Sequence, residues 1–178
     1  KPGSGVNPLR GQNNVQGAAH MGCDPATLPG STPIERGRDA FARRWGAPIP
    51  ATPGLHLLAM MDAAIAGRLK ALWTVGYDVL PTNANAAHTT RALGALDLVI
   101  VQDLFLTETA RQYGPELLPP CPTYEKDRTF VHAERRIQRV RAALRPIGAS
   151  KPDWQIMCEV ARAMGVSGFD FPGPEEIW

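Results

Sequence analysis

Polar residues directly follow two short apolar runs of the chain, and their types and spacing suit them to binding a ligand. Gly76, Tyr77 and Asp78 follow the run "LKALWTV", and Gln102 and Asp103 follow the β-branched run "LVIV". In parallel sheets, ligands bind at the carboxyl ends of the strands, where chain direction and strand order leave a crevice. Glycine and aspartate are also ordinary loop residues after a strand, so the pattern alone leaves both interpretations open.

A third candidate, Asp153, lies at the start of "DWQIMCEVARAMG", a stretch with the apolar spacing of a helix. A carboxylate at this place either favours the helix dipole or faces a ligand. The chain contains neither GxGxxG nor GxxxxGK[ST], which excludes a standard dinucleotide fingerprint and a P-loop. Five arginines crowd residues 135–145, and their alternation predicts a solvated strand face, with an anion site or a partner surface as alternatives.

The elements that position these residues follow from the apolar spacing and from the Gly/Pro-rich breaks of the chain. We predict a short helix over residues 34–45, and further helices over "GLHLLAMMDAAIAGR", "ANAAHTTRALGAL" and "TETARQYG". Apolar runs of four to five residues alternate with these helices, which is typical of βαβ units with a buried parallel sheet. The predicted fold class is therefore α/β, a Rossmann-like and mostly parallel sheet flanked by helices.

Composition narrows the class of protein. The chain has 178 residues and 44% hydrophobic content, enough for a globular core, and 19 Lys and Arg against 17 Asp and Glu. This near balance of charge gives no positive electrostatic field that would attract nucleic acid or an anionic membrane. No apolar run is long enough to span a membrane. The three cysteines form neither a disulfide ladder nor a CxxC clamp, so we expect a cytoplasmic protein.

The opening stretch "GVNPLRGQNNVQGAAHMGCD" has four glycines, two amide-rich clusters and no clear hydrophobic period. We expect a polar, flexible loop there. Its His20 fits either an acid–base role or a hydrogen-bonded structural role. Because the chain starts without methionine and inside what looks like a loop, we expect it to be a piece of a longer polypeptide, or a processed one.

Five stretches occur in order along the chain: "GVNPLRGQNNVQGAAHMGCDP", "GYDVL", "VQDLFLTETA", "EKDRTFVHAERRIQRVR" and "KPDWQIMCEVARAMG". Together they closely resemble the catalytic subunit of molybdenum- or tungsten-dependent formate dehydrogenases. These enzymes belong to the dimethyl sulfoxide reductase family of molybdopterin oxidoreductases. The resemblance covers nearly the whole chain.

The resemblance implies a larger protein with an iron–sulfur region, two α/β domains that each hold one molybdopterin guanine dinucleotide, and a C-terminal β-barrel-like domain. Residues 1–52 would be the active-site loop with its Gly/Pro-rich lead-in, and residues 53–178 one cofactor-binding domain. The chain lacks the cysteine set of a [4Fe-4S] cluster and the Cys-His or selenocysteine-His pair at the metal. Alone, it is therefore not expected to turn over formate.

The resemblance also implies roles for individual residues. Arg10 would orient the formate carboxylate, a task that suits an always-charged planar guanidinium, and Gln12 would lie against the pterin. Gly76, Tyr77 and Asp78 would pass along the dinucleotide, and Gln102 and Asp103 match the pair at the next strand end, where a carboxylate accepts ribose hydroxyls. Leu118 and Pro119 would line the same groove. Asp153 would accept guanine N1–H and N2–H2 side by side.

Two departures from the family pattern affect one loop, since Arg128 replaces a usual glycine and His132 a common asparagine. The implied partners are formate, other domains of the same polypeptide and electron-transfer subunits. Two alternatives stay open at this point. One is a related molybdopterin oxidoreductase acting on nitrate or another small anion, and the other is a stand-alone, non-catalytic domain that holds a guanine nucleotide.

Overall fold

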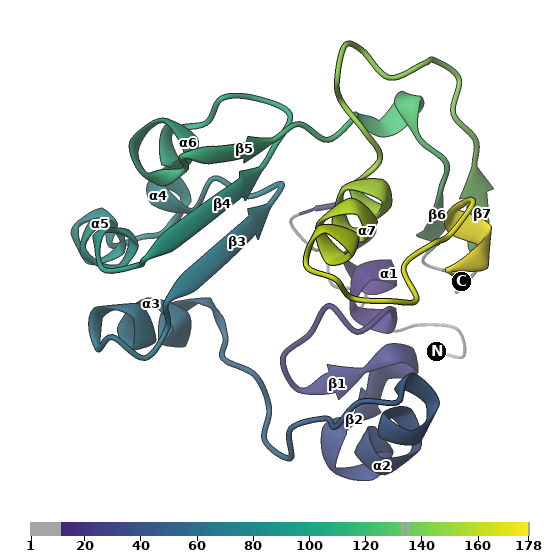
Figure 1. Cartoon of the computed structure of the whole chain (residues 1–178), viewed down its shortest axis with the longest axis horizontal. Coiled ribbons are helices and arrows are strands. Elements are labelled where there is room, and N and C mark those ends of the chain that lie inside the picture. Colours follow the sequence, from purple (N-terminus) through teal and green to yellow (C-terminus); the bar gives the residue numbers. More distant parts are fainter. Residues whose placement is uncertain (1–11, 133, 135, 178) are drawn as a thin grey trace, which may run out of the picture. The chain divides into compact units, whose positions relative to one another are not determined.

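The computed structural model describes residues 12–132, 134 and 136–177 (Figure 1). They form two compact units. The first comprises the chain up to Gly54 together with Thr129–Arg139, and the second comprises Leu55–Arg128 together with the chain from Val140 onward. Each unit is described separately below.

The first unit contains short elements and one longer helix. In chain order they are α1 (Val15–His20), β1 (Thr27–Leu28), η1 (Pro29–Ser31), β2 (Thr32–Pro33), α2 (Ile34–Trp45), β6 (Arg128–Val131) without its first residue, and β7 (Ile137–Val140) without its last. Strands β1 and β2 pair antiparallel, and β6 pairs with β7. The helix predicted over residues 34–45 is confirmed.

The prediction of a loop throughout residues 5–24 is wrong for residues 15–20, which form α1. The six residues of this helix are too few to show a hydrophobic period, but five of them are non-glycine residues compatible with a helix. Asn14, in the left-handed conformation at φ 57°, precedes the helix. Its side chain is held in place because Nδ2 donates to the Thr129 carbonyl at 3.0 Å and Oδ1 accepts from the Val131 amide at 3.0 Å.

The second unit is built around a three-stranded parallel sheet. Its strands are β3 (Ala71–Val75), β4 (Leu98–Gln102) and β5 (Glu116–Leu118), in the order β3-β4-β5. The helical elements of this unit are α3 (Leu57–Ile65), α4 (Val79–Thr82), α5 (Ala86–Gly94), α6 (Glu108–Tyr113), η2 (Thr123–Glu125), α7 (Asp153–Ala163) and η3 (Pro174–Glu176). The predicted α/β class with a parallel sheet is confirmed.

The core of the second unit lies on one face of the sheet. Val99 and Val101, two residues apart on β4, point to the same face and are buried with Leu93 of α5 and Ala110 of α6. A second cluster joins α3 to α5 through residues such as Met61 and Ala92. The apolar run of β4 is therefore explained by burial beneath these helices.

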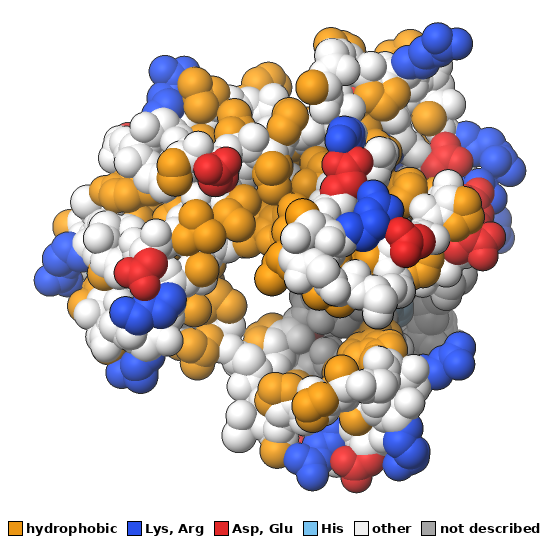
Figure 2. All heavy atoms as spheres, in the orientation of Figure 1, with side chains coloured by type: hydrophobic (Ala, Val, Ile, Leu, Met, Phe, Trp, Pro, Cys, Tyr) orange, Lys and Arg blue, Asp and Glu red, His pale blue; other side chains and the backbone are white. Residues whose placement is uncertain are grey.

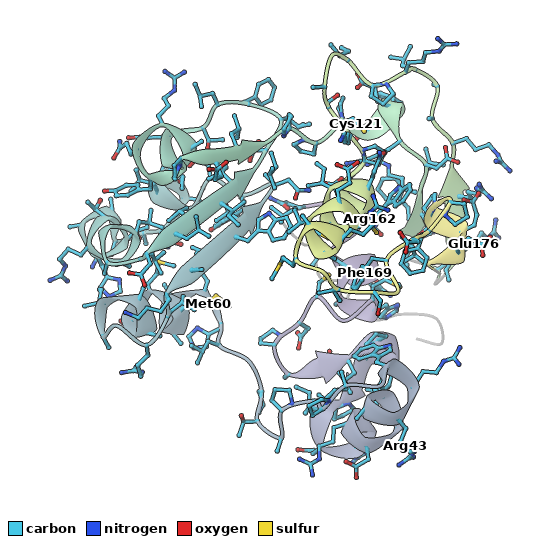
Figure 3. All side chains as sticks on the ribbon, viewed as in Figure 1. Arg43, Met60, Cys121, Arg162, Phe169 and Glu176 are labelled. Carbon is cyan, nitrogen blue, oxygen red and sulfur yellow. The ribbon has the colours of Figure 1, made fainter. Side chains whose placement is uncertain are left out.

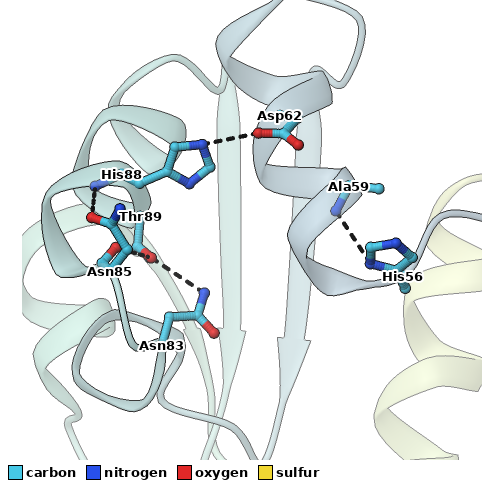
Figure 4. Close-up of polar contacts among 7 residues, drawn as sticks. All are labelled: His56, Ala59, Asp62, Asn83, Asn85, His88 and Thr89. Carbon is cyan, nitrogen blue, oxygen red and sulfur yellow. Dashed lines mark hydrogen bonds and ion pairs between the residues drawn. The ribbon is translucent and has the colours of Figure 1, made fainter.

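Side-chain hydrogen bonds fix the helices of this face, as Figure 4 shows. His56 Nδ1 accepts from the Ala59 amide at 3.4 Å, and Asn85 Oδ1 accepts from the His88 amide at 3.0 Å. Both contacts satisfy backbone donors of a first helical turn. His88 Nε2 also contacts Asp62 Oδ1 at 2.9 Å, which links α5 to α3.

Large apolar side chains remain on the surface, and orange side chains are common on the face drawn in Figure 2. The loop after β4 carries three of them in a row: Leu104, Phe105 and Leu106 are 50%, 75% and 52% exposed. Within the described residues, none of the helices has both the length and the apolar character needed to cross a membrane.

Candidate functional site

The end of β3 turns sharply at Gly76. Its φ is +61°, a conformation that favours glycine, and its amide donates to the Gln102 carbonyl at 2.8 Å. A Cβ built on Gly76 would meet no atom within 4 Å, so this turn is open to an approaching group. The next residue, Tyr77, packs partly against the core. The structure thus brings the ends of β3 and β4 together, as the sequence predicted.

Asp78 binds the first turn of α6. Its Oδ1 accepts from the Thr109 amide at 3.1 Å and the Thr109 hydroxyl at 2.5 Å, and its Oδ2 accepts from the Glu108 amide at 3.2 Å. Thr109 is fully buried, and its hydroxyl oxygen also accepts from the Leu80 amide at 3.0 Å. The carboxylate of Asp78 therefore has a structural task at the strand end where a ligand is expected.

Gln102 at the end of β4 is completely buried, and its side chain reaches the first residue of α7. Gln102 Nε2 donates to Asp153 Oδ1 at 2.8 Å. Gln102 Oε1 is buried and has no hydrogen-bond partner among the described residues. Two of the predicted site residues, 51 positions apart, are therefore in direct contact, and one of them presents an unused acceptor.

The other oxygen of the Asp153 carboxylate binds an ammonium group. Lys126 Nζ forms an ion pair with Asp153 Oδ2, and the two side chains are only 18% and 32% exposed. Charge-assisted bonds of this kind are stronger than neutral ones. Asp153 is consequently fixed from two sides, by a buried amide and by a mostly buried cation.

Two more groups border this ion pair. Burial raises the pKa of the Cys121 thiol, a change that the nearby Lys126 opposes, and Cys121 Sγ donates to the Glu125 carbonyl at 3.5 Å. Cys121, labelled in Figure 3, is therefore a buried, protonated thiol in this environment. Burial lowers the pKa of Arg128, and the charges of Tyr124 and Asp153 oppose that change. Arg128, the departure from the family pattern, thus lies within electrostatic reach of Asp153.

The start of α7 is tied to the end of β5. Leu118 pairs with Gln102 in the sheet register, the Pro119 carbonyl accepts from the Lys151 amide at 3.1 Å, and the Cys121 amide donates to the Lys151 carbonyl at 2.8 Å. Lys151 also pairs with Glu159 on α7 at 2.6 Å, and this hydrogen bond lowers the pKa of Glu159. Residues 118–121 therefore place the α7 N-terminus at the carboxyl edge of the sheet.

The remaining predicted residues are placed as follows. Asp103 is half-buried after β4, and its Oδ1 accepts from the Phe105 amide at 3.4 Å. Gln12 is an exposed residue of the first unit, as is His20 in the last turn of α1. Arg10 lies outside the described residues. The exposed His132 has an Nδ1 that accepts from the Glu134 amide at 3.3 Å.

Comparison with known proteins decides the family. Residues 1–163 match the family model described as molybdopterin oxidoreductase. The chain belongs to the molybdopterin oxidoreductase family. Within the described part of this family member, no group of three or more His, Cys, Asp or Glu side chains is arranged to hold a metal ion.

Several relatives of this molybdopterin oxidoreductase chain align with all of it. YrhE of Bacillus subtilis (strain 168) is 43% identical over 180 residues, which are 100% of this chain and 18% of that protein. The F420-dependent formate dehydrogenase 1 subunit alpha of Methanococcus maripaludis is 40% identical over 179 residues, 100% of this chain and 26% of that protein. Formate dehydrogenase H of Escherichia coli (strain K12) is 39% identical over 181 residues, 100% of this chain and 25% of that protein. The chain thus spans about a quarter or less of the length of these relatives.

A solved structure shares the fold. Acetylene hydratase from Pelobacter acetylenicus superposes with a TM-score of 0.56 at 23% identity, covering 67% of this chain and 17% of that one. This likeness supports the α/β architecture.

Sequence reasoning did not single out Lys126 as part of the site. Lys126 lies in the quoted stretch "EKDR", but nothing local in that stretch indicates a partner 27 residues away. The opposite charges of Lys126 and Asp153 were the only available signal, and a chain with 36 charged residues of four kinds offers many such pairs.

Proposed function

We propose that this chain is the cofactor-binding segment of a formate dehydrogenase large subunit, which in the full-length protein oxidises formate to carbon dioxide. The observation that carries the proposal is the Gln102–Asp153 pair at the carboxyl edge of the sheet. It occurs in a chain that aligns throughout with proteins named as formate dehydrogenases. The proposed location is cytoplasmic, and the sheet is proposed to be part of a larger Rossmann-like domain.

The proposed cofactor is molybdopterin guanine dinucleotide with molybdenum or tungsten held by residues outside this chain. When bound, it would accept the two electrons that formate loses on oxidation. A [4Fe-4S] cluster elsewhere in the full-length protein and electron-transfer subunits would carry these electrons away. The residues present fit the dinucleotide, because they offer a carboxylate, an unused buried acceptor and an unobstructed glycine turn at one sheet edge.

Each residue of this edge would contact a different part of the dinucleotide. Asp153 would accept N1–H and N2–H2 of guanine, a donor pair that adenine lacks. Asp103 would accept ribose hydroxyls beside Gln102. The backbone of Gly76, Tyr77 and Asp78 would pass along the dinucleotide, while the Asp78 carboxylate holds α6. Leu118 and Pro119 would line the same groove.

Arg10 and Gln12 would serve the substrate end. We propose that the Arg10 guanidinium grips the formate carboxylate in its planar fork and orients the C–H bond, and that Gln12 lies against the pterin. Formate oxidation releases one proton and two electrons, and Arg10 changes neither protonation state nor charge in this step.

The test is steady-state formate oxidation by the full-length protein. We expect Arg10→Lys to lower kcat/KM for formate by about tenfold or more, because an ammonium cannot hold a carboxylate in a two-pronged grip. Arg36→Lys, on the exposed side of α2, is the matched control and should leave kcat/KM unchanged. If the full-length protein turns over nitrate and not formate, the alternative of a related oxidoreductase that acts on nitrate is correct instead.

The cofactor half of the proposal has a separate readout. Full-length protein prepared without cofactor is titrated with GDP by calorimetry, beside an Asp153→Ala variant. Binding that is present in the unchanged protein and lost in the variant supports a guanine site at Asp153. Equal GDP binding by both proteins would remove Asp153 from the site.

A further inference from the structure

Asp153 has more protein partners than a carboxylate that only caps a helix needs. One oxygen accepts from the buried Gln102 amide at 2.8 Å, and the other pairs with Lys126. An ionised carboxylate has about four acceptor positions, two on each oxygen. With one position of each oxygen taken, the residues that the structure describes leave one position on each oxygen open.

The two open positions match one kind of ligand. Two adjacent N–H groups that point the same way, as in guanine, would engage both oxygens at once. Hypoxanthine keeps N1–H but lacks the exocyclic amine, and adenine has neither donor in that arrangement. A carboxylate free to rotate would lose conformational entropy on binding such a pair, whereas one already fixed loses little.

Lys126 is well placed to fix it. The residue follows η2, whose Glu125 is anchored because Glu125 Oε2 accepts from the Ile147 amide at 3.1 Å. The Lys126 side chain is only 18% exposed, so this ion pair is shielded from solvent far more than an ordinary surface pair. The unused Gln102 Oε1, buried beside it, is a second sign that the cluster is arranged for a ligand.

We propose that Lys126 is a positioning residue for guanine recognition: together with Gln102 it holds the Asp153 carboxylate in one orientation, so that both oxygens face the base. Lys126 itself does not touch the base. The inference rests on the proposed guanine site and adds to it the residue that sets its preference for guanine over hypoxanthine and adenine.

The test is calorimetric titration of cofactor-free, full-length protein with GDP, IDP and ADP. We expect Lys126→Met to weaken GDP binding about tenfold and to bring it close to IDP binding, with ADP binding unchanged. Lys126→Arg keeps the charge and should stay within about threefold of the unchanged protein. Lys70→Met is the matched control, because the exposed Lys70 precedes the N-terminal end of β3, its Nζ lies 3.8 Å from Asp97 Oδ2, and its loss should leave GDP binding unaffected.

A double variant separates positioning from general damage to the fold. In an Asp153→Ala background, Lys126→Met should cause no further loss of GDP binding, because the group that it positions is gone. A further loss in that background would overturn the proposal. Thermal unfolding of each variant, followed by circular dichroism, shows whether the protein is folded before it is titrated.

The two proposals fail in different ways. If Asp153→Ala loses GDP binding while Lys126→Met binds GDP normally, the positioning role is overturned and the guanine site stands. If Lys126→Met binds GDP more tightly, Lys126 competes with the base and the positioning role is again overturned. If Asp153→Ala binds GDP normally, the guanine site itself is wrong, and the role of Lys126 falls with it.

Discussion

A single carboxylate, Asp78, connects the end of one strand to the beginning of a distant helix. It receives three hydrogen bonds from Glu108 and Thr109, two of them from backbone amides that have no partner within α6. Thr109 is fully buried, so water cannot replace Asp78 as the acceptor for its amide and hydroxyl groups. The sequence indicated Asp78 as a ligand residue, and the structure adds a structural role.

At the residue scale we predict that Asp78→Ala destabilises the chain by about 2 kcal/mol, because buried donors are left unsatisfied. The measurement is urea unfolding of the 178-residue chain followed by circular dichroism. Asp97→Ala is the control, because the ion pair that its side chain forms is exposed. Its Oδ2 lies 3.8 Å from Lys70 Nζ, and the Asp97 and Lys70 side chains are 71% and 64% exposed. The control substitution should lower the free energy of unfolding by less than about 0.5 kcal/mol. Equal costs for both variants would contradict the structural role of Asp78.

A glycine directly after helix α6 packs closely against strand β4. A Cβ on Gly114, directly after α6, would lie 2.8 Å from Val101 Cγ2 and 3.1 Å from Ala110 Cα. Both neighbours belong to the buried cluster on β4 and α6, so neither has room to move. Gly94, the last residue of α5, has no such neighbours within 4 Å.

At the element scale, the same substitution should therefore have opposite effects at these two glycines. We predict that Gly114→Ala destabilises the chain by about 1–3 kcal/mol through overpacking. Gly94→Ala should stabilise it by about 0.5–1 kcal/mol, because alanine is the better helix former. Thermal unfolding of both variants gives the comparison. A stabilising Gly114→Ala would show that α6 and β4 are not packed as described.

The sequence predicted elements with enough local pattern and missed those without it. The helix at residues 34–45 was predictable because Gly/Pro-rich stretches bound it on both sides, and strand β4 was predictable because it is a continuous β-branched run. Helix α4 has four residues and contains Pro81, and β5 has three residues, so neither carries a period. Strand β5 exists because it pairs with β4, which is a contact that no local pattern records.

For the site, the sequence predicted individual residues but not the contacts between them. The end of a predicted strand indicated Gln102, because ligands bind at the carboxyl ends of parallel strands. The start of a predicted helix indicated Asp153 independently. Their contact and the addition of Lys126 depend on how β5 and η2 bring the chain back to α7, and this is a tertiary arrangement. The family resemblance supplied the proposed chemistry, which periodicity alone could not indicate.

At the scale of the whole chain, one exposed connector joins α2 to α3. Residues 46–56 form no helix or strand and contain Pro48, Pro50 and Pro53, and nearly all of them are exposed. The connector contains the boundary between the two units at Gly54. Exposed segments without helix or strand are preferred sites of protease cleavage.

We predict that limited chymotrypsin digestion of the 178-residue chain makes its early cuts in two exposed segments: the loop after β4, after Phe105, which is 75% exposed, and this connector with the residue before it, after Leu55 or Trp45. The Trp45 and Leu55 side chains are 53% and 45% exposed, whereas Leu93 in α5 is 1% exposed. Mass spectrometry of the earliest fragments identifies the cuts. Leu55→Val should remove the cut at that position and leave the one after Trp45. Early cleavage after Leu93 would contradict the description of α5 as a core helix.

The hydrogen bonds from Asn14 to β6 have a consequence for biosynthesis. Asn14 and Thr129 are separated by 115 positions, and a ribosome that adds about 5–20 residues per second needs roughly 6–23 s to travel between them. During that interval α1 and α2 have emerged without the strand that Asn14 binds, while the whole β3-β4-β5 sheet has already been translated. Within this chain, the segment that is made earlier must therefore wait for a later one, and the nascent chain exposes it to chaperones for that interval.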